Sequence, residues 1–193
     1  MTDPNYDQTF VIKMALTCEH EHELLRFLSV AIDNEDQSLS FDNLISLFPE
    51  HMMSSPDPFQ YLLQWRLKYW GVAHDCHLVA KNVAKTEQLF KDNANQKYKE
   101  YLHFTSLFNL PIKLFKDISK YFPHIRYDMI FMKNDLSIGG RMIIENGHLI
   151  NQTLIRYLDD HHDDFLFILQ GLYDQHYPNQ RADDLIKHYH RQS

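Results

Sequence analysis

Residues 151–177, NQTLIRYLDDHHDDFLFILQGLYDQHY, are the longest stretch of the chain that combines a helical pattern with clear ends. Asn151 can cap the first turn of a helix, and Pro178 cannot continue one. The apolar residues of the stretch recur at steps of three and four, as on one face of a helix: Leu154, Leu158, Phe165, Leu169 and Leu172. The pattern predicts a central helix against which the rest of the chain packs.

Most of the remaining chain also has a helical pattern. Proline, glycine and capping residues divide it into further predicted helices: residues 7–32, 40–48, 58–71, 74–91, 97–110, 111–122 and 181–190. Five glycines and seven prolines are few for a turn-rich β protein. The β character is confined to residues 125–150, where Asn146-Gly147 separates two apolar runs and predicts a tight hairpin.

The predicted fold is therefore mainly α-helical, a compact multi-helix bundle or orthogonal array with one small β-hairpin near residues 136–150. The length of 193 residues suits one domain with a sizeable core, and we expect a single helical domain over residues 1–193. No apolar run reaches the ~18 residues of a membrane span, and the polar start does not resemble a signal peptide. Two cysteines suit a reducing compartment. These features predict a soluble cytoplasmic protein.

The net charge of −7 is unevenly distributed along the chain. Residues 1–63 carry 2 Lys and Arg against 11 Asp and Glu, and residues 134–193 carry 5 against 9. Residues 64–133 are basic, with 12 against 6. Either the blocks neutralise one another in the fold, or the basic middle forms a face for an anionic partner.

Histidine and carboxylate pairs suggest a metal centre. A carboxylate and a histidine three residues apart lie on one face of a helix, as ligands do in di-metal bundles. Three such pairs fall on three different predicted helices: Glu19 and His22, Glu100 and His103, Asp159 and His162. His162 lies on the apolar stripe of residues 151–177, where an inward-facing ligand must be. These six residues form a candidate iron, manganese or zinc site, unless they are only a solvated helix face and hydrogen-bonded histidines.

Other catalytic chemistry has less support. Cys18 with His22, or His74 with His77, has spacing that suits two zinc ligands, but neither has the paired spacing of a zinc finger. The sequence has no nucleophile elbow, glycine-rich phosphate loop or dinucleotide fingerprint. Cys76 is interpreted as a small core residue.

The basic middle of the chain also favours nucleic acid. Residues 111–122, residues 124–133 and the hairpin follow one another in helix-turn-helix-wing order. The candidate phosphate contacts are Lys113, Lys116, Lys120, Arg126 and Arg141. Residues 125–132 are very apolar for a helix in a DNA groove, and the overall acidity opposes DNA binding.

Aromatic residues crowd the predicted helix 58–71. The residues are Tyr61, Trp65, Tyr69 and Trp70, which are more than one helix face can bury. Exposed, they would form a surface for a protein partner or a homo-oligomer. The alternative is a helix that is buried on two sides.

The missing catalytic motifs favour a small interaction or regulatory protein without its own catalysis. A helical-bundle metal-dependent enzyme and a nucleic-acid-binding protein are the alternatives. A protein partner or homo-oligomer is expected first, nucleic acid second, and a membrane not at all.

Overall fold

An antiparallel β-sheet dominates the computed structural model, which describes residues 8–33, 39–44, 58–72, 90–92, 97–156, 167–168 and 172. The six strands are β1 (Thr9–Cys18), β2 (Phe90–Asp92), β3 (Lys97–Leu107), β4 (Arg126–Lys133), β5 (Ile138–Glu145) and β6 (His148–Arg156). They are arranged in the order β2-β3-β1-β4-β5-β6. The prediction of a mainly α-helical bundle is therefore wrong.

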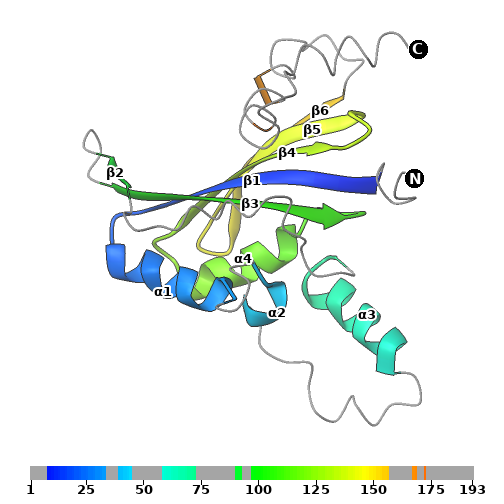
Figure 1. Ribbon diagram of the computed structural model, residues 1–193, viewed down its shortest axis with the longest axis horizontal. Coiled ribbons are helices and arrows are strands. Elements are labelled where there is room, and N and C mark those ends of the chain that lie inside the picture. The colour runs from blue at the N-terminus through cyan, green and yellow to red at the C-terminus, as the bar shows by residue number, and fades with distance from the viewer. Residues whose placement is uncertain are drawn as a thin grey trace.

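Four helices are described: α1 (Glu21–Ala31), α2 (Phe41–Leu44), α3 (Pro58–Tyr69) and α4 (Ile112–Tyr121). In Figure 1, α1, α2 and α4 lie on one side of the sheet, and α3 extends from its margin. Helix α1 packs against β1, and α4 packs against β4 and β5. Strands β3 and β4 both pair with β1, which lies between them, so β3, α4 and β4 form a split β-α-β unit.

The central strand β1 explains the first wrong prediction, a helix over residues 7–32. Its even-numbered residues all point into the core and are buried: Phe10, Ile12, Met14, Leu16 and Cys18. Val11 on the other face is buried too. Because Val11 lies three residues before Met14, and Met14 four residues before Cys18, these buried residues match a helical step although they lie on a strand. The second half of the prediction is confirmed by α1.

Strands also replace two other predicted helices. Residues 97–107 form β3, in which Leu102 and Phe104 face the core and the residues between them face away. Residues 151–156 form the end of β6, so the predicted helix over residues 151–177 is wrong in this part. Phe90 and Lys91, the last two residues of the predicted helix 74–91, lie in strand β2, so the prediction is wrong there, and residues 74–89 lie outside the described chain. Residues 181–190 lie outside it as well.

Local signals at turns and caps were reliable. The turn at Asn146-Gly147 is confirmed, with φ of 43° and 80° between paired strands β5 and β6. The hairpin is larger than predicted, because it belongs to the six-stranded sheet. Ser40 accepts a hydrogen bond from the backbone N–H of Asn43 and so caps α2 as expected. The predicted helices 58–71 and 111–122 are confirmed as α3 and α4.

The two faces of the sheet differ. The helix-covered face holds the main core, where Phe41 contacts the rings of Trp70, Phe104 and Phe115 edge to face. We call the opposite side the open face. It carries a smaller set of buried apolar residues: Val11, Met132, Ile143 and Ile155. Residues 167–168 and 172 lie on this side, and Ile168 and Leu172 are buried (Figure 1).

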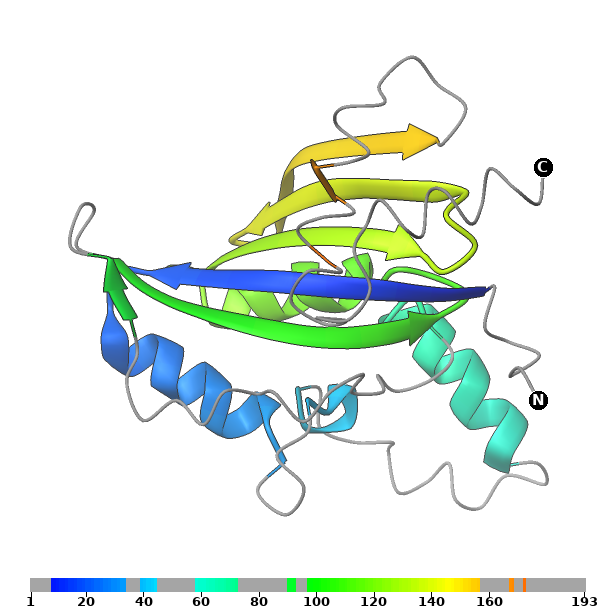
Figure 2. The same cartoon turned by 45° about the horizontal axis from the view of Figure 1, so that its top comes forward.

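Figure 2 shows the length of β1 and β3 side by side, with the β4–β6 meander beyond β1. Alternate side chains of these strands therefore form rows across the open face. Among the helices that the structure describes, none is long and apolar enough to cross a membrane.

Candidate functional site

A hollow of about 210 Å³ lies on the open face, and we call it the open-face site. Its lining comes from β1, β3, β4 and β5 and from residue 167: Lys13, Ala15, Lys99, Tyr101, Asp128, Ile130, Arg141 and Phe167. The strand register explains this set, because Ala15 lies between Tyr101 on β3 and Asp128 on β4. The small side chain of Ala15 leaves a low floor between its larger neighbours.

Two ammonium groups share one aromatic ring in this site. The Nζ atoms of Lys13 and Lys99 lie 5.1 and 5.0 Å from the ring centroid of Tyr101. This is within the distance at which a cation is attracted to an aromatic face. Burial, and then the charge of Lys99, lower the pKa of Lys13. The site therefore holds two neighbouring positive charges, and burial disfavours the charged form of Lys13.

A guanidinium and a carboxylate form the other wall of the open-face site. Arg141 donates from Nε and Nη2 to the two oxygens of Asp128, at 2.8 and 2.6 Å. This hydrogen bonding raises the pKa of Arg141 and keeps its side chain fixed over the sheet. Lys13, Lys99 and Arg141 therefore face one carboxylate among the residues that line the hollow.

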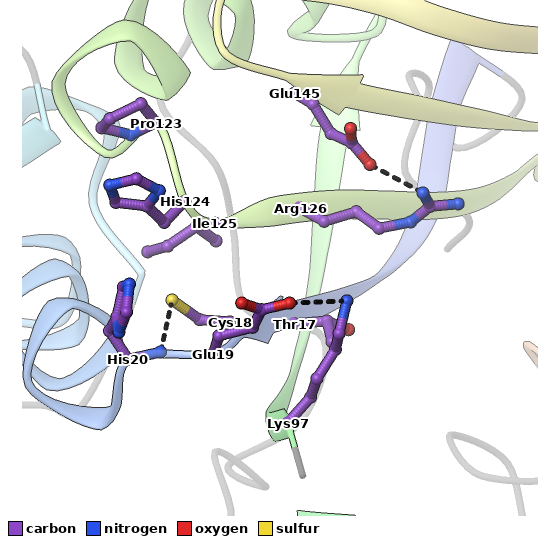
Figure 3. Close-up of a pocket in the computed structure, with 10 residues that line it drawn as sticks. All are labelled: Thr17, Cys18, Glu19, His20, Lys97, Pro123, His124, Ile125, Arg126 and Glu145. Atoms are coloured by element: carbon purple, nitrogen blue, oxygen red, sulfur yellow. Dashed lines mark hydrogen bonds and ion pairs between the residues drawn. The ribbon is translucent and has the colours of Figure 1, made fainter. Parts of the chain in front are cut away.

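A second hollow of about 250 Å³ lies where β1 ends and β4 begins (Figure 3), and we call it the sheet-end hollow. Two ion pairs border it: Lys97 with Glu19 at 3.4 Å, and Arg126 with Glu145 at 2.6 Å. Figure 3 shows both pairs on one side of the hollow and the imidazoles on the other. The full lining is Thr17, Cys18, Glu19, His20, Lys97, Pro123, His124, Ile125, Arg126 and Glu145.

The imidazoles of His20 and His124 meet at the sheet-end hollow. Their rings are perpendicular, with centroids 5.1 Å apart. His20 lies just before α1, and His124 lies in the connection between α4 and β4. The backbone N–H of His124 donates to Oε1 of Glu23 at 3.2 Å, which links this connection to α1. Two groups with N–H donors therefore face the hollow from outside the sheet.

Cys18 lies in the wall of the sheet-end hollow but does not have the properties of a nucleophile. It is a free, buried cysteine, and the backbone N–H of His20 donates to its Sγ at 3.4 Å. Burial raises the pKa of its thiol, so the thiolate form is disfavoured. Because the thiolate is the reactive form, we interpret Cys18 as a core residue.

The two hollows are neighbours, because open-face residues at the end of the sheet also line part of the sheet-end hollow. Thr17 pairs with Lys99 on one side and with Arg126 on the other, so one row of the sheet joins them. We define the cation track as five open-face residues: Lys13, Lys99, Arg141, Lys97 and Arg126. The first three line the open-face site, and the last two line the sheet-end hollow.

The structure does not gather the predicted metal ligands. Glu100 and His103 lie on β3, where residues three apart face opposite sides of the sheet. Burial raises the pKa of Glu100, which accepts a hydrogen bond from the backbone N–H of Tyr101 at 2.8 Å. Glu19 precedes α1, so it does not share a helix with His22. In the described ranges no three His, Cys, Asp or Glu side chains are placed to hold a metal ion.

The other two members of the predicted metal set, Asp159 and His162, lie outside the described residues. Of the three predicted helices that were expected to carry the three pairs, two are replaced by strands where they are described, in residues 97–107 and 151–156. The helical spacing that carried the metal hypothesis is therefore absent where the chain can be described.

The predicted nucleic-acid contacts divide between the two sides of the sheet. Arg126 and Arg141 lie on the open face. Lys113, Lys116 and Lys120 belong to α4 on the covered side, where Lys120 pairs with Asp117 at 2.6 Å. The helix-turn-helix-wing order is wrong, because residues 126–133 are the buried strand β4.

The aromatic residues of α3 also divide. Trp70, just beyond the helix, is fully buried, and Trp65 packs against the main core. Arg66 lies over the ring of Trp70 and pairs with Asp42 at 2.7 Å. Tyr61 and Tyr69 are about two-fifths exposed. Of the four predicted partner-binding aromatic residues, the two tryptophans therefore pack in the fold, and the two tyrosines remain at the surface.

The sequence interpretation missed Lys13, Lys99 and Tyr101. A signal for two of them exists in β3, where Lys97, Lys99 and Tyr101 alternate with core residues. Recognising that period of two would have placed them on one face. Lys13 follows only from the pairing of β1 with β3, which no local pattern reveals.

Comparison with known proteins gives no assignment. No family model matches the chain, and no curated protein or solved structure is significantly similar to it.

Proposed function

We propose that the open-face site binds a nucleotide, with the phosphate against the cations and the base against the aromatic rings. The observation that supports this most directly is the placement of the Lys13 and Lys99 ammonium groups at 5.1 and 5.0 Å from the Tyr101 ring, within one hollow.

The charges of the site favour an anion. Burial and the neighbouring charge of Lys99 both disfavour the charged form of Lys13. A phosphate between the two ammonium groups relieves their repulsion and replaces part of the lost hydration. Arg141 adds a fork of N–H donors whose geometry matches phosphate oxygens.

The aromatic rings favour a ligand that also carries a flat group. Tyr101 is 37% exposed and Phe167 is 68% exposed, although both line the hollow. Stacking a base on such a ring contributes about 1–3 kcal/mol to nucleic-acid binding. The hollow of about 210 Å³ is smaller than the ~300–1,000 Å³ of enclosed ligand pockets. A phosphate and the edge of one base therefore fit it better than a fully enclosed ligand.

Isothermal titration calorimetry with adenosine 5′-monophosphate, adenosine and inorganic phosphate tests the proposal. Lys99→Gln should weaken the binding of the nucleotide and of phosphate by about tenfold, because one charge-assisted contact is lost. Tyr101→Leu should weaken nucleotide binding and leave phosphate binding unchanged. Lys116→Gln on α4 makes the same charge change on the covered side and should have no effect.

The proposal fails if the nucleotide does not bind at millimolar concentration. It also fails if Lys99→Gln and Lys116→Gln weaken binding equally, since the charge effect would then be general and not local.

A further inference from the structure

We infer that the nucleotide is one unit of a single-stranded nucleic acid, whose next phosphates follow β1 from the open-face site to the sheet-end hollow. This inference rests on the proposed function and adds a second phosphate subsite, formed by Lys97 and Arg126.

The register of the sheet supplies the path. Lys13 and Thr17 lie four residues apart on β1, about 13 Å at 3.3 Å per residue, and their side chains share the open face. Lys99 and Arg126 flank Thr17 on the neighbouring strands. A strand of nucleic acid that leaves the open-face site along β1 therefore meets cations from both sides.

The ion pairs of the sheet-end hollow allow a phosphate to enter. The side chains of Lys97 and Arg126 are 44% and 43% exposed, and their partners Glu19 and Glu145 are 68% and 36% exposed. Exposed ion pairs of this kind contribute little to the free energy of unfolding, so exchanging a carboxylate for a phosphate costs little stability. Figure 3 shows Arg126 extending toward Glu145 at the side of the hollow, and its guanidinium can bind a phosphate with two parallel hydrogen bonds.

The histidines complete the second subsite. His20 and His124 line the hollow opposite the two ion pairs (Figure 3). Their imidazole N–H groups are donors, and their rings are flat surfaces on which a base can stack. The hollow therefore repeats the combination of cations and rings that is present at the open-face site.

The rings argue for a single strand and against a duplex. Tyr101 and the two imidazoles offer their surfaces to base faces, which a duplex keeps stacked on one another. A duplex presents phosphates and base edges, which leaves the rings without partners.

The test measures fluorescence anisotropy with labelled 12-nucleotide oligothymidine and oligouridine, and with a 12-base-pair duplex. The double variant Lys97→Gln, Arg126→Gln should weaken binding of the single strands by at least about tenfold, and adenosine monophosphate binding should stay unchanged. The matched control is Lys116→Gln, Lys120→Gln on α4, which removes the same charge from the covered side. Circular dichroism confirms that both double variants fold.

Salt dependence gives a second readout. Each phosphate contact with a single strand contributes about −0.7 to the slope of log K against log salt concentration. The double variant should therefore lower the magnitude of the slope by about 1.4, for two lost contacts. The control variant should leave the slope unchanged.

The outcomes separate the inference from the proposed function. If adenosine monophosphate binds through Lys99 and the oligonucleotides bind no tighter, the second subsite is wrong and the proposed function stands. Equal binding of duplex and single strand, or an unaffected double variant, also overturns the inference. If neither the nucleotide nor the oligonucleotides depend on Lys99, the proposed function is wrong, and the inference fails with it.

Discussion

Arg141 donates two parallel hydrogen bonds to the carboxylate of Asp128, at 2.8 and 2.6 Å, from β5 to the neighbouring strand β4. The side chain of Asp128 is 18% exposed and that of Arg141 is 51% exposed. Asp128 therefore both positions the guanidinium and cancels part of its charge. If the open-face site binds an anion as proposed, this relationship should set the strength of the attraction.

Asp128→Asn should tighten adenosine monophosphate binding by roughly threefold to tenfold, because a neutral amide no longer competes for Arg141. Calorimetry at low and at physiological salt measures the effect, which should shrink as salt screens the charge. Asp117→Asn on α4 is the matched control, since it frees Lys120 on the covered side of the sheet. An unchanged affinity in Asp128→Asn would show that the charge of Arg141 does not act on the ligand.

Nucleotide affinity should fall as the pH rises toward the pKa of Lys13, at lower pH than an ordinary lysine would allow. Burial and Lys99 lower the pKa of Lys13, so Lys13 loses its charge at lower pH than the unfolded chain, whose lysines titrate near 10.5. Lys13→Arg should remove the decline, because an arginine stays charged. Lys99→Gln should move the decline to higher pH, since it removes the repelling charge. Affinity that stays constant up to pH 10 in the natural sequence would contradict this.

The same lowered pKa has a consequence for stability. The native state binds the Lys13 proton less tightly than the unfolded state does. The contribution of Lys13 to the free energy of unfolding should therefore rise with pH between the lowered pKa and 10.5. Urea unfolding of the natural sequence and of Lys13→Met, compared across this range, isolates the contribution.

Tyr127→Phe should stabilise the protein by about 1 kcal/mol, because an unsatisfied buried hydroxyl is removed. Within the described chain, the Tyr127 hydroxyl is buried and has no hydrogen-bond partner. Burial raises the pKa of Tyr127 well above its ordinary value, and the charges of Glu23 and Cys18 add to this. Urea unfolding measures the change, with Tyr101→Phe as an exposed control. A loss of stability would instead indicate that the hydroxyl has a partner, such as a bound water.

Gly140→Ala should cost about 1–3 kcal/mol of stability or more, as overpacking of a core does, because the new Cβ would meet backbone. A Cβ at this position would lie 2.2 Å from the carbonyl oxygen of Thr153 and 2.8 Å from the ring of Phe131. Gly139→Ala is the control, because its Cβ would meet the flexible end of Met132. Thermal unfolding should show a large loss for the first variant and a much smaller one for the second. Equal losses would contradict the close approach of β5 and β6 at Gly140.

The parts of the fold that were predictable are those with a local cause. The Asn146-Gly147 turn needs positive φ at both residues, and few other residue pairs adopt that conformation. The predicted end of a helix at Gly71 has a local cause too, because that glycine adopts a positive φ of 80°. The central strand has no such signal, because its buried residues also match a helical step and its partner strands are distant in the sequence.

In the candidate site, too, the predictions that depended on the residue alone must be distinguished from those that depended on the type of secondary structure. Arg126 and Arg141 were named for their charge, and this does not depend on the type of element that carries them. Glu100 and His103 were paired for helical spacing, which in a strand places them on opposite faces. The first expectation for function, an interaction protein without catalysis and with a protein or homo-oligomeric partner, stays a prediction, as does the cytoplasmic location.

The position of β1 between β3 and β4 has a consequence for the synthesis of the protein on the ribosome. Cys18 pairs with Tyr98 and Thr9 pairs with Leu107, so a chain leaving the ribosome presents β1 long before either neighbouring strand exists. During that interval the apolar strand has two unpaired edges, and folding must wait for contacts that are remote in sequence. Nascent chains that stop before residue 97 should therefore bind chaperones or aggregate, so the cell must protect this strand throughout most of its translation.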